Sequence, residues 1–92
     1  MVFVLNKCYG GFSLSPFAVE RLGISSPYAD LDSLQIDALA ALITEFGSEK
    51  CSGSSAKLEV VEVPDTITDW IVQEYDGIEV LIYVLDGKIY QA

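Results

Sequence analysis

Two Asp-Gly dipeptides, at positions 76–77 and 86–87, constrain the fold of this chain more than any other feature. A type I′ turn needs a positive φ at both of its central residues, and Asp-Gly meets that need at low cost. Each dipeptide separates segments rich in apolar, β-branched and aromatic residues, which is the pattern of a β-hairpin. The sequence therefore predicts strands over 70–75, 78–85 and 88–91, joined by two tight turns.

Two further segments have the composition of strands buried on both faces. Residues 2–6 are apolar without alternation, which is typical of a strand covered on each side. Residues 58–63 lose their alternation between Val60 and Val61, and this indicates either burial on both faces or a β-bulge. Pro64 and Asp65 end the second segment.

A short helix is predicted over 16–22. Ser15 can cap it by accepting a hydrogen bond from a free backbone N–H, and Pro16 loses nothing at the first helical position. Gly23 stands where a left-handed residue commonly ends a helix.

A longer helix begins near Asp32. Asp32 and Gln35 resemble a capping box, and apolar residues follow at helical spacing as far as Phe46, before Gly47. The small and polar residues at 48–56 predict a flexible loop.

The segregation of helices from strands, in the order β-α-α-β-β-β-β, predicts an α+β fold. We expect a single small domain spanning residues 1–92, with a mixed, mostly antiparallel sheet and two helices on one face. Hydrophobic residues make up 51% of the chain and the mean hydropathy is +0.38. A domain of this size cannot hide all of that apolar surface, so we expect part of it in a homo-oligomer or in a partner interface.

The charge balance narrows the classes of partner. The chain has 14 acidic and 5 basic residues and no histidine, for a net charge of −9. This argues against direct binding of nucleic acid and against docking on anionic membranes, since both need clustered Lys and Arg. A basic protein partner, divalent cations or simple solubility remain as explanations.

Location and cofactors are also constrained. The apolar start of the chain is too short for a signal peptide, and no apolar run approaches the roughly 18 residues of a membrane span. We therefore expect a cytoplasmic protein with Cys8 and Cys51 reduced. Two distant cysteines without histidine do not make a zinc site, and no metal or other cofactor is expected.

The segment 6–15 is the best candidate for a ligand site. Its glycines would let the backbone approach a ligand, and the following helix N-terminus offers free N–H groups and a positive partial charge. The spacing matches neither the P-loop nor the Rossmann pattern, and a purely structural tight turn is the alternative. The candidate ligand-binding residues are Asn6, Lys7, Cys8, Gly10, Gly11 and Ser13.

Catalysis has weaker support. Cys8, close to Lys7 and to a helix start, could be a reactive thiol, but the chain has no histidine to act as its base, and a small buried residue is the alternative. The carboxylates of Glu74, Asp76 and Glu79 surround a turn and could serve acid–base chemistry or bind a cation, or could simply form a turn and a solvated face. We expect no enzymatic activity.

Acidic residues dominate the second half of the chain. Eight of them lie between Lys57 and Lys88 with no basic residue among them. A sheet surface with one sign of charge can dock on a basic protein, and an ordinary acidic surface is the alternative. The candidate interface residues are Glu59, Glu62, Asp69, Glu74, Asp76 and Glu79.

The stretch Asn-Lys-Cys-Tyr-Gly-Gly-Phe-Ser-Leu-Ser at 6–15 resembles the opening of a group of small, mostly uncharacterised bacteriophage-encoded proteins, in which an N-terminal strand precedes this loop. Segments 58–65 and 74–77 are similar to later parts of the same group, whereas 78–92 departs from it through the additional Asp86-Gly87 turn. The resemblance implies a phage or prophage origin and action inside a bacterial host cell.

Together these features predict a non-enzymatic protein that binds a host protein with a basic surface. It would use its acidic β surface and exposed apolar area, and it would modulate or inhibit its partner. The alternative is a small-ligand or nucleotide-binding module built on the Gly10-Gly11 loop.

Overall fold

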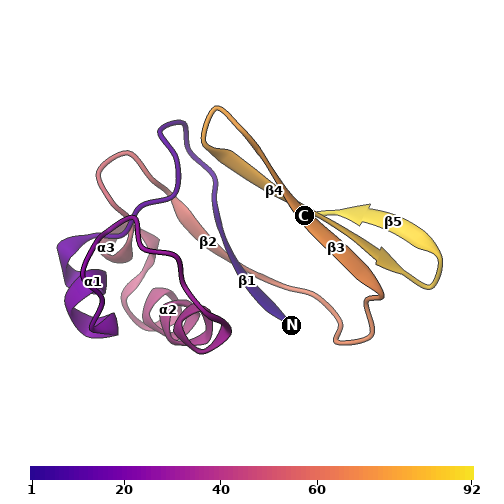
Figure 1. Ribbon diagram of the computed structural model, residues 1–92, viewed down its shortest axis with the longest axis horizontal. Helices are drawn as coiled ribbons and strands as arrows, with labels where there is room; N and C mark the ends of the chain where they lie inside the picture. Colours follow the sequence, from indigo (N-terminus) through magenta and orange to yellow (C-terminus); the bar gives the residue numbers. More distant parts are fainter.

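The computed structural model describes all residues 1–92 as three helices and five strands arranged in three layers (Figure 1). The strands are β1 (Val2–Asn6), β2 (Leu58–Glu62), β3 (Asp69–Tyr75), β4 (Ile78–Leu85) and β5 (Lys88–Gln91), and the helices are α1 (Pro16–Leu22), α2 (Ser33–Phe46) and α3 (Ser48–Cys51). The α+β class is confirmed. The strands form two antiparallel sheets, β1-β2 and β3-β4-β5, where we expected one. None of the helices has the length and apolar character needed to cross a membrane.

The β1-β2 ribbon is the middle layer. Val4 and Leu58 belong to a core cluster with residues of the helices, whereas Leu5 and Val63 belong to a second cluster with Leu81 of β4. Alternate residues of a strand point to opposite faces, so the ribbon has the helices on one side and the three-stranded sheet on the other. The predicted burial of residues 2–6 on both faces is confirmed. Of the two explanations for 58–63, contacts on both faces apply, because the register runs without a bulge.

The helix ends follow from nearby side chains. The Ser15 hydroxyl accepts a hydrogen bond from the Ala18 N–H at 3.1 Å and donates to the Lys50 carbonyl at 2.6 Å. Asp32 and Gln35 form the reciprocal capping box at the start of α2. Both predicted helix starts are confirmed because each depends on residues within one turn of the helix.

The prediction of a flexible loop over 48–56 is wrong at its start, where α3 forms. Cys51 has no exposed surface and belongs to the helical core cluster. Its carbonyl accepts the Ser15 N–H at 2.9 Å, and the Gly53 N–H donates to the Ser13 carbonyl at 3.0 Å. Contacts with the distant 13–15 segment therefore order residues whose own composition favours a loop. Burial raises the pKa of the Cys51 thiol.

The C-terminal sheet has the two predicted hairpins. Asp76 and Gly77 have φ values of 52° and 88°, and Asp86 and Gly87 have 51° and 75°, which is the positive φ at both central residues that type I′ turns require. The register pairs Trp70 with Tyr83 on the face toward β1 and Ile71 with Ile82 on the opposite face, and the two faces alternate along the strands. Phe3 of β1 meets the Trp70 ring edge-on, with centroids 4.9 Å apart, and so joins the two sheets face to face.

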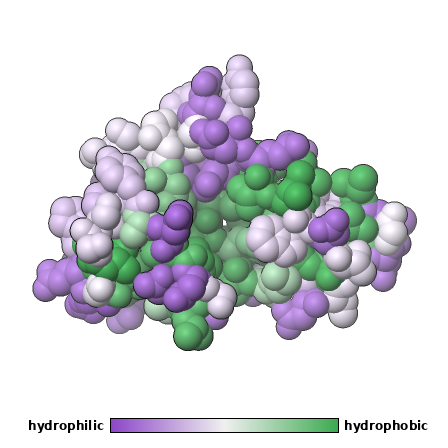
Figure 2. Space-filling model, in the orientation of Figure 1, coloured by the Kyte–Doolittle hydropathy of each residue, from purple (hydrophilic) through white to green (hydrophobic).

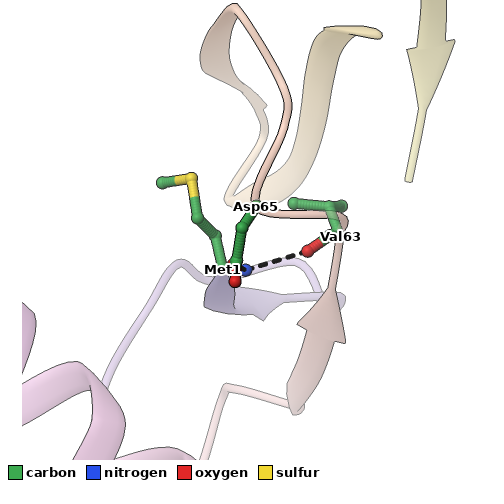
Figure 3. A network of polar contacts seen from close by, with 3 residues as sticks. All are labelled: Met1, Val63 and Asp65. Carbon is green, nitrogen blue, oxygen red and sulfur yellow. Dashed lines mark hydrogen bonds and ion pairs between the residues drawn. The ribbon is translucent and has the colours of Figure 1, made fainter.

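The first residue ties the start of β1 to the end of β2 (Figure 3). The Met1 amine donates to the Val63 carbonyl at 2.8 Å and pairs with the Asp65 carboxylate. The hydrogen bond from the Met1 amine to the Asp65 carboxylate, together with the positive charge of the amine, lowers the pKa of the Asp65 carboxyl. The contact between Met1 and Asp65 is the sole ion pair in the structure.

Candidate functional site

The Gly10-Gly11 loop lies directly against the turn between β3 and β4. A Cβ atom on Gly77 would stand 2.2 Å from the Gly11 nitrogen and 2.8 Å from the Gly10 nitrogen. On another side, a Cβ atom on Gly10 would stand 2.7 Å from the Ser55 Cβ. The loop is therefore held between two distant segments at distances that only glycine permits.

Asn6 is the centre of the polar contacts beside this loop. It has no exposed surface. Its Nδ2 donates to the Gly77 carbonyl at 2.6 Å and to the Cys8 carbonyl at 2.7 Å, while its Oδ1 accepts the Lys57 N–H at 2.8 Å. The side chain thus joins the β3-β4 turn, the 6–15 loop and the start of β2. Sequence reasoning treated Asn6 as a ligand residue; the available signal for its structural role was a polar residue ending an otherwise apolar strand.

Lys7 and Glu79 join β1 to β4 next to Asn6. Lys7 Nζ donates to the carbonyls of Glu79 at 2.7 Å and Ala92 at 3.3 Å. Glu79 Oε1 accepts the Asn6 N–H at 2.7 Å, and Glu74 Oε1 accepts the Gly77 N–H at 2.7 Å. The Lys7 and Glu79 contacts hold the two sheets together, whereas the Glu74 contact lies within the β3-β4 turn.

The six candidate ligand residues are close together in space, but they do not surround an opening. Ser13 is buried and Cys8 is half-buried. None of the three principal cavities is lined by any of the six residues. The ligand-binding hypothesis stays a prediction, and the packed loop offers it no cavity.

The Glu79 carboxyl is expected to make stability depend on pH. Burial is the main cause that raises its pKa; the Asn6 N–H opposes this shift, the Glu74 charge adds to it, and Lys7 opposes it. Because folding disfavours the ionised form, stability should fall as the pH rises from the ordinary carboxyl range through this raised pKa. Glu79→Gln, which keeps an acceptor for the Asn6 N–H, should be more stable than the natural protein at neutral pH.

Urea unfolding at neutral and at acidic pH measures this effect. The advantage of Glu79→Gln should shrink as the pH falls, because the natural carboxyl then becomes neutral as well. Glu62→Gln, on an exposed residue of β2, is the control and should show no such pH-dependent difference. A Glu79→Gln protein that is less stable at neutral pH would show that the charge itself is stabilising.

The candidate acidic interface does not form one continuous face. Five of its residues are exposed, namely Glu59, Glu62, Asp69, Glu74 and Asp76, while Glu79 is half-buried. The β3-β4 register puts Glu74 and Glu79 on the face toward β1 and Asp69 on the opposite face. No three Asp, Glu or Cys side chains gather in an arrangement that could hold a metal ion.

A different surface stands out on the three-stranded sheet. Alternation along the strands points a set of aliphatic side chains away from β1, and we call this the outer face: Ile71, Ile78, Val80, Ile82, Val84 and Ile89. None of these residues belongs to either core cluster, and Ile71 and Ile89 are 52% and 76% exposed. Figure 2 shows hydrophobic residues at the surface of the half of the molecule that contains the three-stranded sheet. Sequence reasoning missed the outer face because the run at 80–85, which has no charged residue, is typical of a strand buried on both sides.

The chain was also compared with known proteins. No protein-family model, no curated protein and no solved structure matches it. The outer face and the negative charge of the molecule are therefore the basis for a functional proposal.

Proposed function

We propose that this is a non-enzymatic binding protein that docks on another protein through the outer face. The six aliphatic side chains of that face carry the proposal, because no helix or strand covers them. Contiguous exposed apolar patches on small proteins commonly mark interaction sites. Burial of this face against a partner would remove apolar side chains from water without any change in the fold.

The charge of the molecule supports a basic partner. The chain carries 14 acidic residues, and its single ion pair joins Asp65 to the terminal amine, so no carboxylate is paired with Lys or Arg. Such a field accelerates the approach of a positively charged partner, while the apolar contact supplies most of the affinity. In keeping with the resemblance to bacteriophage proteins, we propose that the partner is a cytoplasmic host protein that is modulated or inhibited by binding.

Substitutions on the outer face test this function. The Ile71→Glu/Ile89→Glu double variant should lose a host protein that the immobilised natural protein retains from bacterial lysate, and added salt should weaken that retention. Leu34→Glu is the matched control, because Leu34 is also highly exposed, at 78%, but lies on α2. Equal retention by all three proteins would contradict the proposal.

A second copy of the chain is the alternative occupant of the outer face. Sedimentation of the purified protein over a range of concentrations distinguishes the two cases. A dimer that the double variant abolishes, without retention of any host protein, would assign the face to self-association. A monomer at all concentrations, with retention of a host protein, is the expected result.

A further inference from the structure

An apolar groove of about 670 Å³ lies between the helical layer and the three-stranded sheet. Residues 1–5 of the β1 region run along it, residues 28–37 before and within α2 form one wall, and Trp70 and Val72 of β3 form the other. Twelve of its 16 lining residues are hydrophobic. Figure 2 shows a hollow between the two halves of the molecule, with hydrophobic residues along it. We call it the interlayer groove.

The edge of β1 that faces this groove has no partner strand. The Met1 carbonyl accepts the Val63 N–H at 3.0 Å, and the Lys7 N–H donates to the Lys57 carbonyl at 2.8 Å. In an antiparallel ladder every second residue bonds to one neighbour and the residues between them point the other way. The N–H and C=O groups of Val2 and Val4 therefore point away from β2, and the sheet order places no strand there.

The main-chain N–H of Asn6 points in the same direction and does have a hydrogen-bond partner. Asn6 is the next residue in the same series, and its N–H is bonded to Glu79 Oε1 at 2.7 Å. Val2 and Val4 have no equivalent bond. Val4 is only 6% exposed, and unpaired main-chain groups in such surroundings are unfavourable. The groove thus combines apolar walls with a short row of free backbone donors and acceptors.

We propose that the interlayer groove binds an extended, apolar peptide segment of a partner protein as an additional strand on β1. Strand addition of this kind takes affinity from main-chain hydrogen bonds and specificity from side-chain contacts. An added strand would point alternate side chains toward the helical wall, at Leu31 and Ile36, and toward the sheet wall, at Trp70 and Val72. Both walls are apolar, so the segment should be apolar at successive positions.

Charge adds a second requirement for the bound segment. The groove is lined by the acidic residues Asp30, Asp37 and Glu79 and by no Lys or Arg, and the positive amine of Met1, which also lines it, is paired with Asp65. Lysine or arginine next to the apolar run would therefore complement the groove, whereas acidic residues there would be repelled. This site is separate from the outer face, because Trp70 and Val72 lie on the opposite side of the sheet from Ile71.

Fluorescence anisotropy with a synthetic peptide tests the proposal. The probe is a labelled run of valine and isoleucine between lysines, and the full-length protein should bind it. The same peptide N-methylated at alternate residues cannot donate to the β1 edge and should bind at least about tenfold more weakly. Replacement of its lysines by aspartates should also weaken binding. An N-methylated peptide that binds as well as the parent would overturn the strand-addition geometry, and a parent peptide that does not bind would overturn the site.

Adjacent residues of β3 provide matched protein variants. Val72→Glu places a charge on the groove wall and should weaken the peptide about tenfold or more, whereas Ile71→Glu points to the outer face and should leave its affinity unchanged. Equal effects of the two substitutions would overturn the proposal.

Amide hydrogen exchange gives a readout that does not depend on any variant. The peptide should slow exchange at Val2 and Val4, the two residues with free N–H groups on this edge. If exchange at both amides instead slows with protein concentration in the absence of peptide, a second copy of the chain occupies the groove and the peptide proposal is overturned.

Discussion

Gly77→Ala is expected to lower the free energy of unfolding by roughly 2–5 kcal/mol, out of a total of about 5–14 kcal/mol for a domain of this length. Two effects add. Gly77 has a φ of 88°, which an L-residue adopts only with strain. The new Cβ would also stand 2.2 Å from the Gly11 nitrogen, a backbone atom that can yield only if the whole loop shifts.

Gly87→Ala is the matched control. Gly87 occupies the same position in the second Asp-Gly turn with a φ of 75°, and nothing lies within 4 Å of the Cβ that alanine would add. This substitution should be destabilising by only about 1–2 kcal/mol, the strain term alone. Urea unfolding followed by circular dichroism measures both variants. Equal losses at the two turns would show that the Gly77–Gly11 approach contributes nothing to stability.

Asn6→Ala is expected to be destabilising by about 3 kcal/mol or more. The substitution removes three hydrogen bonds at once and leaves the carbonyls of Gly77 and Cys8 and the Lys57 N–H without this partner. A buried polar group that loses its partner costs about 1–3 kcal/mol. Because these groups belong to three segments, their separation should also loosen the 6–15 loop, which faster amide exchange there would reveal.

Two further substitutions calibrate the Asn6 result. Asn6→Asp keeps an acceptor for the Lys57 N–H but loses the amide donors and adds a negative charge close to Glu79. It should be at least as damaging at neutral pH and partly recover in acid, where a protonated carboxyl can donate one hydrogen bond. Gln91→Ala, at an exposed position, should change stability by less than about 0.5 kcal/mol. An Asn6→Ala protein within that same range would refute the assigned role of Asn6.

The elements that sequence reasoning located correctly are those encoded by neighbouring residues. Ser15 caps α1 through a residue three positions later, and Asp32 and Gln35 form their capping box within one turn. The Asp-Gly turns are equally local, because the preference for positive φ belongs to the dipeptide itself. The helix α3 was missed because distant contacts of Cys51, and no local propensity, hold it in place.

The candidate sites could be predicted less well from the sequence. Gly10 and Gly11 have the same local meaning in a ligand loop and in a packed turn, and the contact that distinguishes the two cases comes from Gly77, far along the chain. No basic residue lies among the acidic residues of the second half of the sequence, yet the strand register places Asp69 and Glu79 on opposite faces of the sheet. Spacing along the chain predicts which residues alternate, but it does not predict which face another layer will cover.

The amino-acid sequence by itself determined the α+β class, the helix caps, the two hairpins and the burial of the first strand on both faces, because capping, φ preferences and apolar periodicity act over a few residues. Only the tertiary structure decided that the strands form two sheets, that β4 is covered on one face only, and that one edge of β1 faces an apolar groove. Those outcomes depend on which distant segments pair and stack. The packing of whole layers determines which of these arrangements has the lowest free energy.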